Sequence, residues 1–365
     1  MKQGWEYRRF DEVFDLQMGK TPDRKNPNYF GGKNVWISIR DLGNKVISES
    51  NEHITDIAVS DTNIRKVKKG TVIMSFKLTV GKCGIAAKDL YTNEAIMAFN
   101  TKECYDIDSS FLYYYLQSYN WKGTNKAVMG LTLNKATISR QIINFPPKST
   151  QLTIVSELDK INELIRLKKE QLKDFDDLAQ SIFYEMFGDP VENEKGWEVK
   201  KLGEVCDLKA GKSIKASELS SIKSDNLYPC YGGNGIRGYI AKISHNGTYP
   251  IIGRQGALCG NVNLASGEFY ATEHAVVCTP SKQFDTIYLF FALRAMKLNQ
   301  YARGVAQPGL AVSNITPLSI PLPPLHLQQL FAHCIEQIEH QKTEVQKAIT
   351  ELETLLASRL QYWFE

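Results

Sequence analysis

Several features that would assign this chain to other protein classes are absent from its 365 residues. No apolar run approaches the roughly 20 residues that a membrane-spanning helix needs, and no apolar stretch follows the basic residues of the N-terminal MKQGWEYRRF. The seven cysteines form no close pair, and the six histidines show neither C-x-x-C nor H-E-x-x-H spacing. We therefore expect a cytoplasmic protein with reduced thiols and no metal site.

Complete catalytic motifs are also lacking. An adenine methyltransferase needs N/D-P-P-Y/F, but NPNY at 26–29 has Asn28 in place of the second proline, and no glycine-rich turn supplies a methyl-donor pocket. A phosphate-binding loop needs G-x4-G-K-S/T, but Cys206 replaces the leading glycine of AGKS at 210–213, and VGKC at 80–83 ends in Cys83. A stand-alone modification enzyme or nuclease is therefore the less favoured hypothesis.

What the chain does contain is an internal repeat. GWEYRRFDEVFDLQMGK at 4–20 aligns without a gap to GWEVKKLGEVCDLKAGK at 196–212, with nine identities in seventeen positions. LNKATISRQIINFPP at 133–147 aligns to LAVSNITPLSIPLPP at 310–324, and the segments between these matches show little similarity. The pattern indicates two lobes with related ends and different interiors.

A long helix is predicted after each Pro-Pro pair, because proline cannot sit in a helix interior and apolar residues then recur with alternating four-three spacing. The two seams carry a lysine at matching places, Lys168 and Lys342. Each helix spans about 37 residues, roughly 55 Å, which is too long to be buried in a lobe. We predict that the two helices pair through Leu158, Ile161, Ile165, Leu172, Phe175, Ile335, Ile338, Val345, Ile349 and Leu352.

Charge follows the same division of the chain. Residues 1–147 carry a net charge of +6 and residues 196–324 carry +5, whereas 148–195 carry −4 and 325–365 carry −3. Positive lobes attract a polyanion such as DNA, although helices that favour Glu on solvated faces account equally well for the acidic segments.

The lobes are predicted to be sheet-rich with one short helix each. In the first lobe, apolar runs bounded by turn residues predict strands near 35–39, 69–76, 81–87 and 95–99, and 111–119 reads as a buried helix. In the second lobe, dense glycines predict tight turns that expose polar side chains.

Arg bonds a guanine edge in two places, and Asn or Gln bonds an adenine edge, so such residues on rigid loops suit a base reader. Surface loops of most proteins carry the same residue types, so residue type does not by itself indicate DNA contact. We select the candidates by their predicted position on loops. The predicted DNA-contacting residues are Lys20, Thr21, Ser38, Arg40, Lys77, Thr79, Asn134, Lys135, Lys212, Tyr231, Asn234, Arg237, Arg254, Gln255, His274 and Asn314.

These segments resemble a known family. GKTPDRKNPNYFGGKNVWISIRDL at 19–42 is similar to the opening of a target-recognition domain from specificity subunits of type I restriction-modification systems, and YGGNGIRGY at 231–239 is similar to a second variety of that domain. The repeated GWE segment, the Pro-Pro exit and the long helix with Q-x3-V-x2-L-D-x-I at 151–161 also resemble that family. The resemblance covers essentially the whole chain.

The resemblance implies an α+β fold: two target-recognition domains separated by two long antiparallel coiled-coil helices, in a pseudo-two-fold internal repeat. The expected boundaries are 1–147 and 191–324 for the recognition domains, and 148–190 and 325–365 for the helices. It further implies that each lobe reads half of an asymmetric bipartite DNA site and that the helices set the spacer.

The implied partners are double-stranded DNA, two methyltransferase subunits and restriction/translocase subunits that defend bacteria against foreign DNA. The chain itself is expected to be non-catalytic and to hold no cofactor; S-adenosylmethionine, ATP and Mg2+ are expected in the partner subunits. The alternative is a coiled-coil scaffold with two protein-binding lobes.

Overall fold

The computed structural model describes residues 2–121, 125–127, 130–256, 258–304 and 308–365. The chain divides into two compact units: Met1–Leu167 with Ile349–Glu365, and Lys168–Ala348. Each unit therefore contains one lobe together with part of each long helix.

The first lobe contains the strands and the short helix that the sequence predicts at 35–39, 69–76, 81–87, 95–99 and 111–119, now as β3, β6, β7, β9 and α3. Its elements are β1 (Glu6–Arg9), α1 (Phe10–Val13), β2 (Phe14–Met18), β3 (Phe30–Ile37), the 3-10 helix η1 (Ile39–Asp41), β4 (Val46–Ile47), β5 (Glu52–Ile54), α2 (Asp56–Thr62), β6 (Val72–Ser75), β7 (Cys83–Ala86), β8 (Tyr91–Thr92), β9 (Ile96–Thr101), α3 (Ser109–Ser118), β10 (Asn125–Ala127), β11 (Gly130–Thr132), α4 (Lys135–Ser139) and β12 (Ile142–Phe145).

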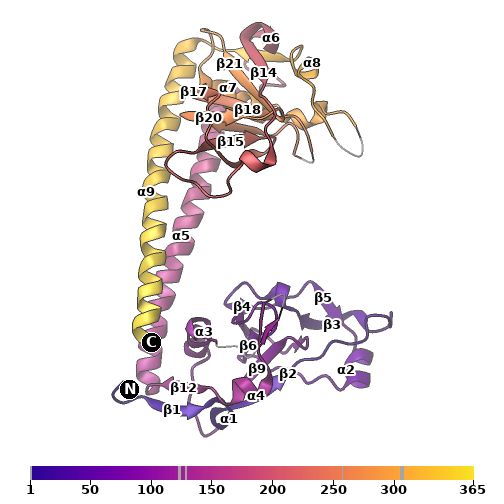
Figure 1. Cartoon of the computed structure of the whole chain (residues 1–365), viewed down its shortest axis with the longest axis vertical. Coiled ribbons are helices and arrows are strands. Elements are labelled where there is room, and N and C mark those ends of the chain that lie inside the picture. The colour runs from indigo at the N-terminus through magenta and orange to yellow at the C-terminus, as the bar shows by residue number, and fades with distance from the viewer. Residues whose placement is uncertain (1, 122–124, 128–129, 257, 305–307) are drawn as a thin grey trace. The chain divides into compact units, whose positions relative to one another are not determined.

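Two sheets form the body of this lobe (Figure 1). One has five strands in the order β2-β9-β6-β7-β4, and the other has three in the order β5-β3-β8. All four residues of β6 are buried, as is typical of a central strand that is covered on both faces and therefore reads as a continuous apolar run.

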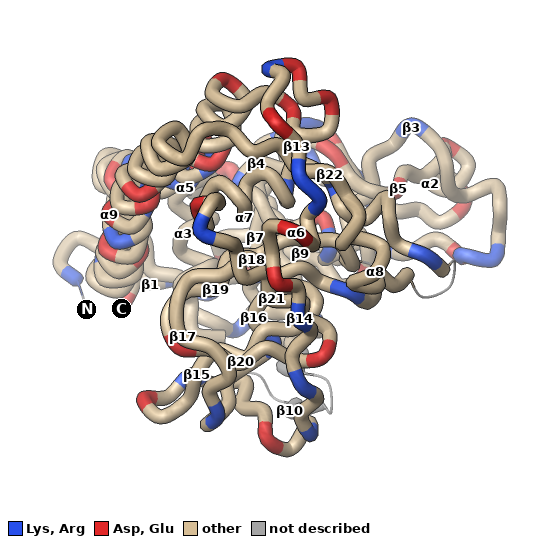
Figure 2. Tube along the Cα trace, turned by 90° about the horizontal axis from the view of Figure 1, so that it is seen from above, with Lys and Arg blue, Asp and Glu red and all other residues tan. Residues whose placement is uncertain are grey.

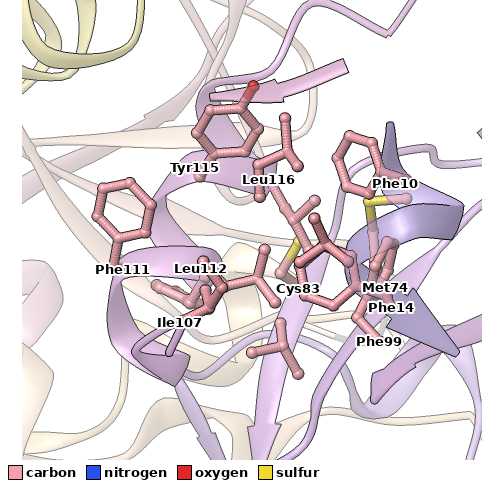
Figure 3. Close-up of a cluster of buried hydrophobic side chains, with 14 of the residues drawn as sticks. Phe10, Phe14, Met74, Cys83, Phe99, Ile107, Phe111, Leu112, Tyr115 and Leu116 are labelled. Carbon is pink, nitrogen blue, oxygen red and sulfur yellow. The ribbon is translucent and has the colours of Figure 1, made fainter. Parts of the chain in front are cut away.

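Aromatic side chains fill the space between the larger sheet and α3 (Figure 3). Phe10 of α1 lies against Phe14 and Phe99, with ring centroids 5.7 and 5.8 Å apart, and Phe111 and Tyr115 of α3 stack at 6.2 Å. This core explains why the apolar run at 111–119 forms a helix that is buried along most of its length.

The second lobe is built from β13 (Glu198–Lys201), α6 (Leu202–Val205), β14 (Cys206–Ala210), η2 (Ala216–Glu218), β15 (Tyr228–Gly232), β16 (Gly235–Ile240), β17 (His245–Asn246), β18 (Tyr249–Gly253), β19 (Val262–Ala265), β20 (Glu268–Ala271), β21 (Ala275–Pro280), α7 (Thr286–Ala295), η3 (Leu298–Tyr301), α8 (Val312–Ile315) and β22 (Ser319–Leu322). Its sheets run β14-β21-β18-β19 and β16-β15-β20-β17.

The two lobes share one topology although their interior sequences differ. The order β2-β9-β6-β7 corresponds to β14-β21-β18-β19, and the parallel pair β3 with β8 corresponds to β15 with β20. A close approach recurs after the first sheet strand: a Cβ on Gly19 would lie 2.2 Å from the oxygen of Thr92, and one on Gly211 would lie 2.0 Å from that of Ala271. The first lobe adds β4 as a fifth strand.

The long helices are α5 (Lys148–Phe187) and α9 (Leu325–Phe364), of 40 residues each. Within the first unit, Arg359 near the end of α9 donates to Glu157 near the start of α5. Within the second unit, Lys342 of α9 donates to Asp176 of α5 at 2.8 Å. In the same unit Phe183 of α5 packs against Phe331 of α9 at 5.7 Å, so the two helices run antiparallel there. The expected fold class, with its internal repeat, is confirmed.

Seven of the predicted pairing residues are buried: Leu158, Ile161, Ile165, Ile335, Ile338, Val345 and Ile349. Leu172, Phe175 and Leu352 are half-buried. Partial burial opposes the charge on Lys342, but its hydrogen bonds to Asp176 and Glu339 hold the pKa of that ammonium above its ordinary value. Acidic and basic positions are intermixed along α9 (Figure 2).

A buried glutamine joins each lobe to its long helix. Gln151 of α5 is 1% exposed, accepts from the amide of Asp108 at 2.8 Å and donates to the oxygen of Pro146 at 2.9 Å. Gln328 of α9 is fully buried and makes the same pair of bonds with Asp285 and Pro323, both at 2.8 Å. The two junctions are therefore built alike, residue for residue.

Each lobe is also closed at its base by a pair of strands. The repeated GWE segment leads into β1 or β13, which pairs antiparallel with the strand before Pro-Pro, β12 or β22. The first and last strands of a lobe thus lie side by side where the long helix begins.

All seven cysteines are free thiols, and burial raises the pKa of Cys206 to about 12. Among the described residues, no three His, Cys, Asp or Glu side chains are placed to share a metal ion. Within the same residues, no helix has both the length and the apolar character that crossing a membrane requires.

Candidate nucleic-acid interface

Three loops of the second lobe enclose a hollow of about 600 Å³. They are the β15–β16 turn, the segment after β18 and the turn between β20 and β21. The residues that line this second-lobe hollow are Gly232, Gly233, Asn234, Gly235, Ile236, Arg237, Gln255, Gly256, Leu258 and His274.

Close backbone packing holds these loops together. A Cβ on Gly253 would lie 1.8 Å from the oxygen of Gly233, so only glycine fits there. The amide of Arg254 donates to the oxygen of His274 at 3.1 Å, and the amide of Leu310 donates to the oxygen of Arg254 at 2.8 Å. The dense glycines of the sequence therefore fix the loops against one another.

Four predicted DNA-contacting residues meet at this hollow: Asn234, Arg237, Gln255 and His274. The first three are exposed. The Oδ1 of Asn234 accepts from Asn261 at 2.9 Å, which leaves its amide nitrogen available. The set offers both donors and acceptors from separate loops, as readout of a base edge requires.

One residue that lines the hollow, His274, has a buried Nδ1 that makes no hydrogen bond among the described residues. Behind two lining glycines lie further buried atoms of this kind. A Cβ on Gly232 would lie 3.9 Å from Thr272 Oγ1, which has no partner, and one on Gly235 would lie 3.5 Å from the side chain of Asn263, whose Nδ2 has none. Buried polar groups are normally satisfied, so the unpaired Nδ1 of His274 is consistent with a polar ligand at the hollow.

The remaining second-lobe candidates lie elsewhere. Tyr231 is 8% exposed, and its ring packs edge-on against Phe269 at 5.5 Å. Arg254 is half-buried, with its backbone engaged as above. Lys212 is exposed after β14, and the half-buried Asn314 belongs to α8.

The first lobe presents its candidates on corresponding loops. The amide of Asn93 donates to the oxygen of Ile37 at 2.9 Å, as that of Thr272 does to the oxygen of Tyr231. The exposed Arg40, three residues after Ile37, therefore corresponds to Asn234. Arg40 follows Ser38 in a tight 3-10 turn.

A second correspondence follows from the loop between β6 and β7. The amide of Leu133 donates to the oxygen of Phe76 at 2.9 Å, which matches the bond from Leu310 to Arg254. Lys77, whose ammonium lies 5.5 Å from the Phe76 ring, therefore takes the place of Gln255. Thr79 is exposed in the same loop.

Two first-lobe candidates have local structural roles. Ser38 donates to Asp41 at 2.7 Å across η1, and Asn134 accepts from the amide of Thr137 at 2.8 Å as the cap of α4. Burial opposes ionisation of Asp41, yet hydrogen bonds from Asn51 and Ser38 hold its pKa below the ordinary value. Lys135 is exposed beside the Asn134 cap.

Lys20 and Thr21 lie on the loop that follows β2. The amide of Lys20 donates to the oxygen of Thr92 at 2.8 Å, its ammonium donates to the oxygen of Thr62 at 2.6 Å, and Thr21 bonds Glu94. In the second lobe the amide of Lys212 makes the equivalent hydrogen bond to the oxygen of Ala271 at 3.1 Å. Both lysines are exposed and occupy the same place in the two lobes.

Known proteins resemble the chain along nearly its full length. It matches the model of the type I restriction modification DNA specificity domain twice, over residues 2–174 and 194–354. It is 32% identical over 360 residues to the specificity subunit of the type I restriction enzyme EcoprrI from Escherichia coli, covering 92% of this chain and 87% of that protein. The chain belongs to the type I restriction-modification DNA specificity family.

More distant members of this family agree. The specificity subunit of the type I restriction enzyme MjaIX from Methanocaldococcus jannaschii is 24% identical, with coverage of 96% of this chain and 90% of that protein. The crystal structure of the type I system S subunit from M. genitalium has a TM-score of 0.57 at 16% identity, covering 100% and 98% of the two chains. A chain from a structural study of type I R-M complex assembly scores 0.65 at 18% identity. These two structures support the fold.

The fold of this specificity-family chain shows residues that sequence reasoning missed. Asn263 and Thr272 lie next to glycines that line the hollow, and Glu273 precedes His274, but none of the three was a candidate. A signal was present: Tyr91-x-x-Glu94 and Tyr270-x-x-Glu273 occupy matching places before β9 and β21. Two matching residues could not be distinguished from a chance similarity until the structure aligned the strands of the two lobes.

Proposed function

We propose that the chain is the DNA-specificity subunit of a type I restriction-modification complex, and that each lobe reads one half of an asymmetric, bipartite DNA site. The observation that carries this proposal is that equivalent loop positions in the two lobes carry different side chains. Arg40 corresponds to Asn234, Lys77 to Gln255 and Ala95 to His274, by the hydrogen bonds that the two lobes share.

Unlike side chains at equivalent places have different base preferences. Arg and Lys favour the two acceptors of guanine, whereas Asn and Gln favour the donor and acceptor of adenine. Two readers of the same geometry and different chemistry would recognise two different half-sites. Lys20 and Lys212, which are common to both lobes, suit phosphate contacts that carry no sequence information.

The long helices would determine the distance between the half-sites. A helix of 40 residues spans about 60 Å at about 1.5 Å per residue. We further propose that two methyltransferase subunits dock against these helices, and that restriction/translocase subunits join them in the cytoplasm. In this proposal S-adenosylmethionine, ATP and Mg2+ belong to those partners, and the chain itself is non-catalytic.

DNA binding tests this proposal against the scaffold alternative. The chain, assembled with its methyltransferase subunits, is titrated with duplexes that do or do not contain the methylated motif of the host, at increasing salt. We expect sequence-selective binding that weakens steeply with salt, because phosphate contacts release counterions. Equal binding of all duplexes at physiological salt would contradict base reading, and salt-insensitive or absent binding would favour the scaffold.

A further inference from the structure

The second unit contains a groove of about 1050 Å³. Phe290 and Phe291 of α7 line it on one side, and Glu336 and Glu339 of α9 line it on another. Leu264 of β19 also lines it. The groove is distinct from the second-lobe hollow and shares no lining residue with it.

The corresponding place in the first unit is occupied by the chain's own Lys45. The matched junctions of Gln151 and Gln328 relate α3 to α7 and the two long helices by 177 residues. By this relation Tyr113, Tyr114 and Asp159 correspond to Phe290, Phe291 and Glu336. The ammonium of Lys45 lies 4.8 Å from the Tyr114 ring and 5.9 Å from the Tyr113 ring, and it pairs with Asp159.

Strand β4 delivers this lysine. β4 adds to β7 in parallel: the amide of Ile85 donates to the oxygen of Lys45 at 2.8 Å, and that of Ala87 donates to the oxygen of Ile47 at 2.9 Å. In the second lobe β19 takes the place of β7, and Leu264 and Ser266 take the places of Ile85 and Ala87.

No fifth strand covers β19 among the residues that the structure describes, since β19 ends the order β14-β21-β18-β19. Leu264 and Ser266 both line the groove, so the free sheet edge and the groove are open to the same side. An uncovered edge strand offers a row of backbone groups for another strand to pair with.

The groove presents a carboxylate and aromatic rings that could bind a lysine ammonium. Among the described residues, no lysine occupies the position that corresponds to Lys45. The side chain of Glu336 is 77% exposed, and its ion pair is with His333 at 3.6 Å, whose side chain is 66% exposed. Phe291 lacks the hydroxyl that Tyr114 donates to Asp159. Glu336 therefore keeps its capacity for a cation, and the adjacent rings of Phe290 and Phe291 offer faces on which an ammonium can rest.

We infer that the second unit binds a segment of a partner protein that adds to β19 as a fifth strand and places a lysine between Glu336 and the rings of Phe290 and Phe291. The segment has the character of Lys45-Val46-Ile47, a lysine followed by two β-branched residues. Main-chain hydrogen bonds to the sheet edge give such additions their affinity, and side-chain pockets give them specificity.

Other occupants fit less well. A second copy of this chain would have to release its own 45–47 segment from β7. Arg294, Lys297 and Lys342 also line the groove, but Lys342 is paired with Asp176 and Glu339, and DNA would bring phosphates beside the exposed Glu336, where like charges repel. The inference does not depend on base reading by the lobes.

A peptide with the sequence of residues 42–50, LGNKVISES, serves as the probe. The full-length chain is added to the labelled peptide up to a chain concentration of about 1 mM. Binding is measured as the fluorescence anisotropy of the peptide. We expect saturable binding that weakens about tenfold or more when the peptide lysine is replaced by alanine, or when the chain carries Glu336→Lys. Glu344→Lys makes the same charge change on α9 outside the groove and should leave the affinity unchanged.

Absence of saturable binding up to that concentration, or equal affinity for the Glu336→Lys and wild-type chains, would overturn the inference. Thermal unfolding of both variants checks that they are folded, which is expected because both glutamates are exposed. DNA binding by the Glu336→Lys chain in its complex is measured in parallel. Since the groove and the hollow are separate, unchanged DNA binding together with lost peptide binding distinguishes this site from the reading surface.

Discussion

Arg237 is the side chain of the second lobe best placed to read a guanine. It is exposed at the hollow, on the β16 side of a turn that is fixed by close backbone contacts, and its guanidinium can donate two parallel hydrogen bonds. Neighbouring Asn234 and Gln255 can complete a base-edge pattern. We therefore expect base recognition in this lobe to depend on these few side chains.

Replacing this side chain tests the assignment. Arg237→Ala should remove about 1–3 kcal/mol of discrimination at one position of one half-site and leave the other half-site unchanged. The measurement is a competition assay with duplexes substituted at each position in turn. Lys347→Ala, an exposed charge on α9, is the control and should leave the preference at every position intact.

If Arg237→Ala instead weakened binding equally for all sequences, the side chain would be a phosphate contact. If it changed nothing, Arg237 would lie outside the interface.

Residue types on glycine-rich loops selected Asn234, Arg237, Gln255 and His274 as candidates, and the structure brings these four to one hollow. The same criterion selected Tyr231, Ser38 and Asn134, which pack or cap in the structure. The reason is physical: Ser and Asn are favoured both as helix caps and as DNA contacts, and only the local backbone distinguishes the two roles. For all seven residues, contact with DNA stays a prediction. Asn263 was missed because its importance comes from a missing hydrogen-bond partner.

At the scale of elements, the junction between lobe and long helix is built with the same hydrogen bonds in both units. Gln328 satisfies the amide of Asp285 and the oxygens of Gln283 and Pro323 inside a fully buried site. Asp285 in turn caps α7, the helix that packs under the sheet. The glutamine thus links the orientation of the lobe to its helix.

Gln328→Ala should lower the free energy of unfolding by about 1–3 kcal/mol, because it leaves buried backbone groups without partners. Gln329→Ala changes the adjacent, exposed glutamine and should alter stability by less than about 0.5 kcal/mol. Urea unfolding of the two variants gives the comparison. Equal stability of both would show that the buried hydrogen bonds contribute nothing at this junction.

Helix length gives a second prediction at this scale. Seven residues inserted after Leu167 of α5, and seven after Ala348 of α9, keep the heptad seam in register. The two insertions lengthen each helix by about 10.5 Å, or roughly three base pairs of DNA. The methylated motif of a strain that carries this variant should have a spacer longer by about that amount. An unchanged spacer would refute the role of the helices in setting it.

The elements themselves were largely predictable. Heptad spacing located both long helices, and apolar runs between turn residues located the central strands, because these patterns reflect burial directly. The junction glutamines were not predicted, because a single polar residue within a heptad pattern is normally interpreted as solvent-exposed. The fifth strand β4 was not predicted either, because two residues are too few to show alternation.

At the scale of the whole molecule, one lobe-and-helix plan is used twice with two different surfaces. The shared plan includes the paired base strands, the buried glutamine and the lysine after the first sheet strand. The difference lies in the loops at Arg40 and Asn234, and at Lys77 and Gln255. A chain built in this way should recognise two unlike half-sites independently of each other.

The most direct test exchanges the first lobe and sequences the methylated genome. Residues 1–147 are replaced by the first lobe of another member of this specificity family, and the variant is expressed with the methyltransferase subunits. We predict an interrupted motif in which one half-site is new while the other half-site and the spacer are retained. A motif that changes in both halves, or that has no interruption, would contradict independent reading by two lobes.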